Sequence, residues 1–256
     1  PVFTFASANV GTGIAITTAG YTISGADAGK YVLSQPTGLT ANITAKQLTV
    51  TGITGNNKEY DDTNAGSATG TASLSGIEAG DVVNLGGSPV FTFASANVGT
   101  GVTLNTTGYT ISGTDSGNYT LTQPTLSANI TAKGLTITGL TGDNKVYDDS
   151  NAGSASGTAS LSGLEAGDDV SLGGSPVFTF ASANVGTGVT LSTTGYTISG
   201  TDSGNYTLTQ PTLSANITVK QLTITGLTGD NKVYDDSNAG SATGTASLSG
   251  IEAGDV

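Results

Sequence analysis

An internal repeat of about 87 residues constrains the fold of this chain more than any other feature. The tripeptide Tyr-Asp-Asp begins at Tyr60, Tyr147 and Tyr234. The segment PVFTFASANVGTG begins at Pro1, Pro89 and Pro176. One inserted residue, Gly38, accounts for the slightly longer first interval of this second series. Because a fixed period of this length is typical of stacked structural units, the chain is predicted to be one module used several times.

The period divides the 256 residues into two complete modules and two partial ones. The predicted segments are 1–46, the later part of a module; 47–133 and 134–220, two complete modules; and 221–256, the earlier part of a module. Together the partial segments lack only a counterpart of residues 83–88. Either the chain is a window of a longer covalent array, or partial modules of neighbouring chains complement each other through exposed strand edges. Neither partial segment is expected to fold stably alone.

The secondary structure is predicted to be almost entirely β, because apolar residues alternate with Thr and Ser in short runs between Gly, Asn, Asp and Pro. In the second complete module the runs are residues 135–141, 145–148, 157–163, 169–172, 177–180, 188–193, 195–199, 205–210 and 213–219. The best helical candidate is a single turn in residues 161–168. We predict a tandem array of elongated, mostly antiparallel β-sandwich modules of immunoglobulin-like type, with a β-grasp-like arrangement as the alternative.

The larger apolar residues are predicted to form a narrow core, because most occur at positions i and i+2 and so share one face of a strand. In and after the second complete module they are Leu161, Phe178, Phe180, Tyr196, Ile198, Tyr206, Leu208, Ile217, Leu222, Ile224 and Val233. A core of this size fills about one narrow layer, so each module should be slender.

Composition excludes several classes of function. The chain has no Cys, His, Met or Trp, and its seven basic residues are all Lys, for a net charge of −12. It cannot be held by disulfides, and a chain this acidic offers no basic patch for nucleic acid or an anionic membrane surface. No run approaches the roughly 18 apolar residues of a spanning helix, so no membrane insertion is expected in this segment.

The residue types present also argue against catalysis. Without His or Cys the usual pairs of nucleophile and base cannot be assembled, so we predict that the protein is not an enzyme and has no catalytic residue. The acidic residues recur at predicted turns, where turn and cap chemistry is the simplest interpretation. Calcium binding is the alternative, with Asp148, Asp149 and Asp202 as candidate ligands, although their loops lack the spacing of a strong calcium motif. No other cofactor is expected.

Several motifs recur in a fixed order and carry a family resemblance. They are K-x-Y-D, G-x-E-A-G-D-x-V, F-x-x-x-x-V-G-x-G, S-G-x-D-x-G-x-Y and A-N-I-T-x-K. This series resembles the YDG repeat of large bacterial adhesins of the filamentous-haemagglutinin kind. The resemblance implies an extracellular location on a bacterial cell surface, in long arrays that serve as stalk or adhesive modules. Asp62, Asp149 and Asp236 replace the Gly of the family name, and Asp can still adopt a positive φ in a turn.

Connector length bears on the function of such an array. At the predicted boundaries one residue separates consecutive strands, as Gly134 does after Lys133, so a flexible tether is excluded and a semi-rigid rod is predicted. In one hypothesis the modules are spacers that project a binding domain and contact only neighbouring modules. In the other they are adhesive, and bind a glycan, a host protein or identical chains in biofilm contacts, or assemble into a filament from split modules. Hot spots favour Trp, Tyr and Arg, and a chain without Trp or Arg favours the spacer.

Overall fold

The computed structural model describes residues 1–255; Val256, the last residue of the fourth predicted segment, lies outside the described residues. The chain divides into two compact units, residues 1–131 and the residues from 132 onward. Helical structure in residues 1–255 is limited to three short 3-10 turns, η1 (Ala28–Lys30), η2 (Ser116–Asn118) and η3 (Ser203–Asn205). None of them approaches the length needed to cross a bilayer. The prediction of an all-β fold is confirmed.

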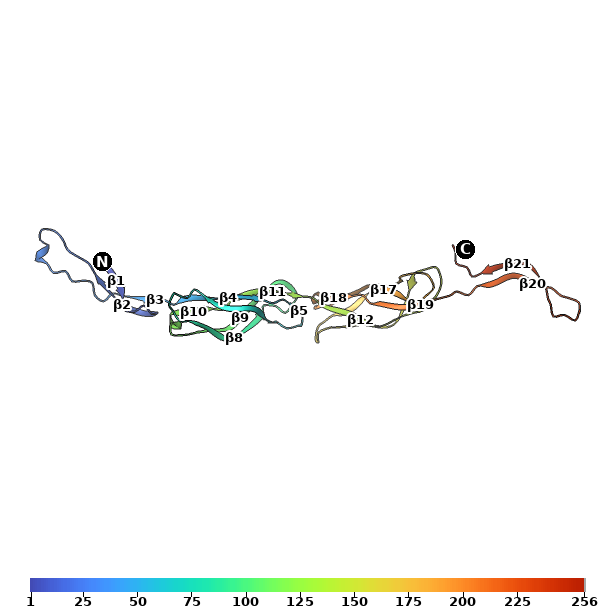
Figure 1. The fold of residues 1–256 in the computed structure, drawn as a ribbon, viewed down its shortest axis with the longest axis horizontal. Helices are drawn as coiled ribbons and strands as arrows, with labels where there is room; N and C mark the ends of the chain where they lie inside the picture. The colour runs from blue at the N-terminus through green and yellow to red at the C-terminus, as the bar shows by residue number, and fades with distance from the viewer. Residues whose placement is uncertain (256) are drawn as a thin grey trace. The chain divides into compact units, whose positions relative to one another are not determined.

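The complete module of the first unit has eight strands in two sheets. Its strands are β4 (Lys46–Gly55), β5 (Lys58–Glu59), β6 (Ala65–Gly66), β7 (Ala68–Ser75), β8 (Asn84–Phe93), β9 (Gly99–Ser112), β10 (Tyr119–Thr122) and β11 (Thr125–Thr131). One sheet has the order β10-β4-β7, and the other has the order β5-β11-β9-β8-β6. Figure 1 shows that this module is long and narrow, with β10 and β5 toward its opposite ends.

The complete module of the second unit repeats this arrangement strand for strand. Its strands are β12 (Lys133–Gly142), β13 (Lys145–Val146), β14 (Ala152–Gly153), β15 (Ala155–Ser162), β16 (Ser171–Phe180), β17 (Gly186–Ser199), β18 (Tyr206–Thr209) and β19 (Thr212–Thr218). Most pairs are antiparallel, as predicted, but β12 pairs with β18 and β13 with β19 in parallel. The helix that a β-grasp arrangement requires is missing from residues 1–255, which favours the sandwich.

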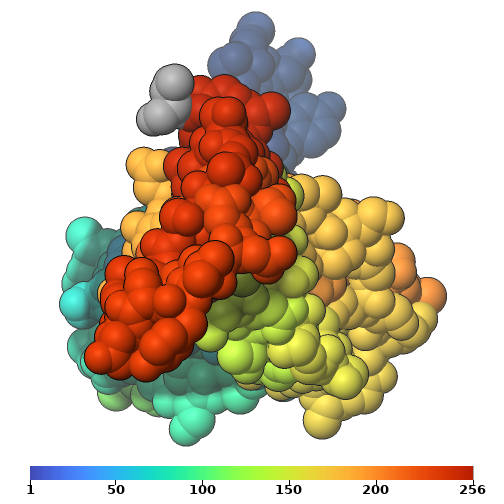
Figure 2. All heavy atoms as spheres, turned by 90° about the vertical axis from the view of Figure 1, so that its right-hand side faces the viewer, coloured from blue at the N-terminus to red at the C-terminus, as the bar shows by residue number. Residues whose placement is uncertain are grey.

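The two partial modules form smaller sheets. The N-terminal one has the order β1-β2-β3, with strands β1 (Val2–Phe5), β2 (Gly11–Ala19) and β3 (Thr40–Ile43). The C-terminal one is a two-stranded hairpin of β20 (Thr223–Gly229) and β21 (Ala242–Ser249). In Figure 2 this hairpin, drawn in orange to red, forms a narrow ridge, and all residues of both its strands are exposed.

Several predicted short strands are parts of longer ones. Residues 188–193 and 195–199 belong to the single strand β17, and residues 169–172 and 177–180 fall on or beside β16. Gly174 and Gly195 explain the difference, since both have positive φ and lie at the register shift between β16 and β17. A Cβ at Gly174 would lie 2.1 Å from the Gly195 carbonyl oxygen, so the glycines allow a bulge within a pair of strands rather than a turn.

Each complete module has a buried apolar core. In the first unit Leu48, Val83 and Tyr119 form a buried cluster against Ile111 and Leu121. In the second unit a cluster of Phe180, Leu191, Ala215 and Ile217 is packed by Tyr147, Phe178, Val189 and Leu213. Of the predicted core residues, Phe180, Tyr206 and Ile217 are buried, and Leu161, Phe178, Tyr196, Ile198 and Leu208 are half-buried.

The core prediction is wrong for three residues, Leu222, Ile224 and Val233, which are exposed. Leu222 and Ile224 lie in the C-terminal partial module, which lacks the strands that cover Leu135 and Ile137 in the complete module. Val233 differs in that its counterpart Val146 is also exposed, on the edge strand β13. Burial in this fold therefore depends on strands that are distant in sequence.

Candidate functional site

The Tyr-Asp-Asp loop is organised around a lysine ammonium. Lys145 Nζ donates hydrogen bonds to Asp148 Oδ1 at 2.6 Å, to the Ser150 carbonyl at 2.6 Å and to the Ala152 carbonyl at 3.0 Å. It also lies 5.7 Å from the centre of the Phe180 ring, within range of a cation–π interaction. These contacts hold the pKa of Asp148 below its ordinary value, chiefly through the hydrogen bond from Lys145. Lys145 therefore holds the Tyr-Asp-Asp loop against the buried Phe180 ring of the core.

The second Asp of the tripeptide occupies a left-handed turn. Among residues 1–255, Asp62, Asp149 and Asp236 are the non-glycine residues with positive φ, at 57°, 56° and 60°. Aspartate tolerates this region better than most side chains, because its short polar group can bond to the local backbone. The expectation that Asp preserves a turn with positive φ is confirmed.

A second recurrent cluster lies in the Glu-Ala-Gly-Asp loop. The Tyr206 hydroxyl donates to Asp168 Oδ2 at 2.6 Å and accepts from the Glu165 backbone N–H at 3.0 Å. Burial and the bond to Asp168 raise the pKa of Tyr206 to about 12. Lys133 forms an ion pair with Glu165 beside this tyrosine. Tyr119, Asp81 and Glu78 repeat the arrangement in the first unit, so the loop is fixed to its own module in both.

Within the first unit, the N-terminal partial module contacts the complete module that follows it. The backbone N–H of Val10 donates to Asn118 Oδ1 at 2.9 Å, and Asn118 Nδ2 donates to Asn9 Oδ1 at 3.2 Å. Only residues 44 and 45 separate β3 from β4. The ion pair of Lys46 with Glu78, at 2.5 Å, lies beside a groove of about 320 Å³ that Asn9, Val10 and Asn118 also line.

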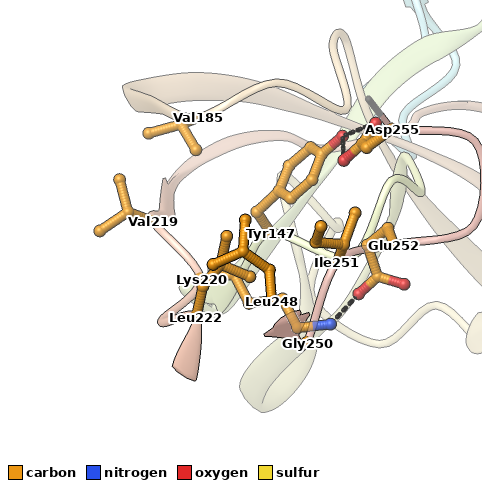
Figure 3. A pocket seen from close by; sticks show the side chains of 10 residues that line it. All are labelled: Tyr147, Val185, Val219, Lys220, Leu222, Leu248, Gly250, Ile251, Glu252 and Asp255. Carbon is orange, nitrogen blue, oxygen red and sulfur yellow. Dashed lines mark hydrogen bonds and ion pairs between the residues drawn. The ribbon is translucent and has the colours of Figure 1, made fainter. Parts of the chain in front are cut away.

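Within the second unit, the complete module contacts the C-terminal partial module in a similar way (Figure 3). The Tyr147 hydroxyl donates to the carboxylate of Asp255, with oxygens at 3.0 and 3.2 Å. This bond and burial raise the pKa of Tyr147 to about 12. Lys220 pairs with Glu252 at the same place. A hollow of about 420 Å³ beside them is lined by the apolar side chains of Val185, Val219, Leu222, Leu248 and Ile251.

The two junctions draw on the same parts of the repeat. Val10 and Val185 come from the same Ala-Asn-Val loop, and each lies beside the Lys-Glu ion pair of the repeat that follows, Lys46 with Glu78 and Lys220 with Glu252. Since two neighbouring repeats supply each junction, the contacts can fix the angle between them. The candidate functional site of this chain is therefore the junction between successive repeats.

Comparison with known proteins agrees with this repeat structure. The family model described as the YDG domain matches residues 1–38, 44–126 and 131–213, which together exceed half of the chain. The chain belongs to the YDG domain family. No curated protein and no solved structure matches it significantly. The YDG repeat predicted from the motifs is confirmed, with Asp in the place of the third letter.

The calcium candidates of this YDG protein are not brought together. Asp148 is paired with Lys145, Asp149 Oδ1 lies 3.3 Å from the Tyr147 hydroxyl oxygen, and Asp202 accepts from the Asp169 backbone N–H at 2.9 Å. Residues 1–255 contain no cluster of three acidic side chains placed to hold a metal ion. In the Tyr-Asp-Asp loop the Lys145 ammonium already bonds to Asp148 Oδ1 and to the Ser150 and Ala152 carbonyls, the oxygen atoms that a calcium ion would otherwise bind. Calcium binding stays a prediction, and residues 1–255 hold no assembled set of ligands for it.

Sequence analysis missed the junction contacts of the YDG repeats. Asn118 with Asn9, and Tyr147 with Asp255, are each more than 100 residues apart and belong to different repeats. These residues recur with the period of the repeat, but so do residues that make contacts only within their own module. No local sequence signal distinguishes residues that contact a neighbouring repeat from residues that do not.

Proposed function

We propose that these YDG repeats are structural spacers of an extracellular bacterial adhesin, forming a semi-rigid array that projects a binding domain from the cell surface. In this proposal the repeats have no catalytic activity and need no cofactor. The observation that carries it is the junction within the first unit, where a two-residue connector is flanked by hydrogen bonds of Val10 and Asn9 with Asn118.

Connector length supports limited bending. Flexible tethers are long and rich in Gly and Ser, whereas β3 and β4 are joined by Thr44 and Ala45 alone. In sequence, only residue 132 lies between the end of β11 and the start of β12. Within the second unit residues 219–222 separate β19 from β20, and the contact of Tyr147 with Asp255 further restricts rotation there. A spacer of this kind adds length to the array and needs no binding surface of its own.

The surface chemistry also supports the spacer. The chain has neither Trp nor Arg, two of the residue types that dominate binding hot spots. Of the tyrosines in the first complete module, Tyr60 and Tyr119 are buried and so are not available to a ligand.

A second candidate function is adhesion by the modules themselves. One observation favours it: an exposed valine recurs at Val90 on β8 and at Val177 on β16. A weak contact repeated along an array gains strength through avidity. In that case the repeats would bind a glycan or host protein, or identical chains on a neighbouring cell.

The two functions can be separated by a binding screen. The whole 256-residue chain is tested on a glycan array and against host extracellular-matrix proteins, beside a Val90→Ser, Val177→Ser double variant. The spacer proposal predicts no reproducible micromolar binding by either protein. Binding by the parent chain that the double variant loses would contradict it and assign adhesion to the repeated valine.

A further inference from the structure

The three-stranded sheet of each complete module ends in a long edge strand. Among residues 1–255, β7 pairs with β4 alone and β15 pairs with β12 alone, so one side of each edge strand has no neighbouring strand. We propose that these edges pair with the same edges of a second copy of this chain, so that copies associate side by side through antiparallel strands. The proposal goes beyond the spacer function and is independent of it.

β7 and β15 differ from the other edge strands of the complete modules. β5 and β13 are two residues long and each contains a lysine, β6 and β14 are also two residues long, and β10 and β18 have four residues. Short edge strands and charged side chains protect a sheet from pairing with another chain. β7 and β15 have eight residues each and contain neither a charged residue nor Pro. They are therefore the least protected edges of the two modules.

A bulge sets the part of β7 that can pair regularly. Gly70 has a φ of 108° and lies at the register shift between β7 and β4. In the stretch Thr71–Ser75 that follows, exposed Thr and Ser residues alternate with the half-buried Ala72 and Leu74. A symmetric antiparallel pair centred on Ser73 would therefore place exposed side chains opposite exposed ones, and half-buried side chains opposite half-buried ones.

The chemistry of this edge favours a second copy as its partner. The chain has a net charge of −12, so two copies repel each other overall, but pairing of these edges brings no charged side chain opposite another. Hydroxyls already pair across the strands of this sheet, because Thr51 Oγ1 lies 3.2 Å from Ser73 Oγ and Thr138 Oγ1 lies 3.1 Å from Ser160 Oγ. An identical strand supplies the same kind of partner on the open side and extends the sheet.

The same edge recurs along the chain. β7 and β21 both have the sequence ATGTASLS, and β15 has ASGTASLS, at the same place in the repeat. A single pair of such short segments gives a weak contact, whereas several contacts between the same two chains gain strength through avidity. Association should therefore be weak, and should increase with the number of repeats.

A charge-swap experiment on the whole chain tests this inference. One variant has lysine at the centre of each edge, and a second has glutamate at the same three positions, Ser73, Ser160 and Ser247. The matched control places three lysines on exposed residues of the adjacent strands β4, β12 and β20, as Thr49→Lys, Thr136→Lys and Thr223→Lys. Sedimentation equilibrium is measured from micromolar to millimolar concentration, and circular dichroism checks that each variant keeps its fold.

We expect the mass of the parent chain and of the control to rise with concentration. Each edge variant alone should raise the dissociation constant by about tenfold or more, because like charges then lie opposite each other. An equimolar mixture of the lysine and glutamate variants should associate again, because opposite charges meet, and added salt should weaken that mixture. Amide protection of Thr71–Ser75 in the parent chain should increase with concentration.

Four results would overturn the proposal. The first is a parent chain that stays monomeric over the whole concentration range. The second is equal loss of association in the control, which would place the contact on the face of the sheet rather than on its edge. The others are edge variants that associate as well as the parent chain, and a mixture that associates no better than either edge variant alone.

Discussion

Residues 135–155 of the complete module and residues 222–242 of the C-terminal partial module have the same sequence letter for letter, yet their structures differ. In both segments a lysine ammonium donates hydrogen bonds to an aspartate and to two backbone carbonyls, Lys145 in one and Lys232 in the other. We call this arrangement the lysine clamp. The positive φ at Asp149 and Asp236 is also shared. By contrast, the short strands β13 and β14 and the burial of Leu135 and Ile137 occur only in the complete module.

The comparison separates what the segment encodes from what its surroundings supply. The clamp, the turn and the hairpin pairing are made by residues within about 30 positions of one another, so they form wherever the segment stands. The core and the parallel strand pairs need β16 to β19, which the partial module lacks. Identical substitutions in the two copies should therefore have unequal effects wherever the property is tertiary, and equal effects wherever it is local.

The largest expected difference concerns Leu135 and Leu222. Leu135→Ala should lower the free energy of unfolding of the complete module by about 2–5 kcal/mol, because it leaves a cavity in a fully buried site. Leu222→Ala, at the same position of the C-terminal partial module, should change it by less than about 0.5 kcal/mol. Calorimetry resolves the module transitions. Equal losses from the two variants would show that the hairpin is as well covered as the module.

The glycines at 153 and 240 offer a test of packing. A Cβ at Gly153 would lie 2.5 Å from Leu191 Cδ1 and 2.9 Å from Phe180 Cε2, whereas nothing lies within 4 Å at Gly240. Gly153→Ala should destabilise the complete module by about 1–3 kcal/mol through overpacking. Gly240→Ala is the matched control and should leave chemical denaturation unchanged. A tolerated Gly153→Ala would mean that this core is loosely packed.

The lysine clamp is local and should respond to pH. Lys145→Met should cost about 1–2 kcal/mol, because the Ser150 and Ala152 carbonyls lose their donor. The clamp also depresses the pKa of Asp148. Its stabilisation is therefore complete above the ordinary aspartate pKa, about 3.9, and is lost as pH falls through the lower folded-state pKa. The gap between the melting temperatures of parent and variant should narrow in strong acid, because the Asp148 contribution is lost while the two carbonyl bonds remain, and a constant gap would contradict this assignment.

The smallest expected effect is a stabilisation. The Thr193 hydroxyl is buried in β17 and has no hydrogen-bond partner among residues 1–255, as is also true of Thr106 and Thr18. Thr193→Val keeps the shape and removes the unsatisfied hydroxyl, so it should raise the free energy of unfolding by about 1 kcal/mol. The same gain is expected from Thr106→Val in the first unit. Loss of stability in both variants would reveal a partner for the hydroxyl, such as a buried water.

Sequence reasoning succeeded where a property is periodic or local. The recurring motifs predicted the YDG repeat, alternation predicted an all-β fold, and the chemistry of Asp predicted the positive φ at Asp149. It failed where a property depends on distant partners. Gly195 resembles a turn residue but allows a bulge beside Gly174, and Leu222 resembles Leu135 but has no covering strand. The junction pair of Tyr147 with Asp255 was missed for the same reason.

Limited bending between repeats is the central claim of the spacer account, and small-angle X-ray scattering tests it most directly. Proteins with two, four and six complete repeats are compared at matched concentration. Because β9 spans 14 residues, each repeat should add about 45 Å at about 3.3 Å per residue. The account predicts a maximum dimension that increases linearly with repeat number by about this amount. An increase with the square root of repeat number, as in a flexible chain, would contradict it.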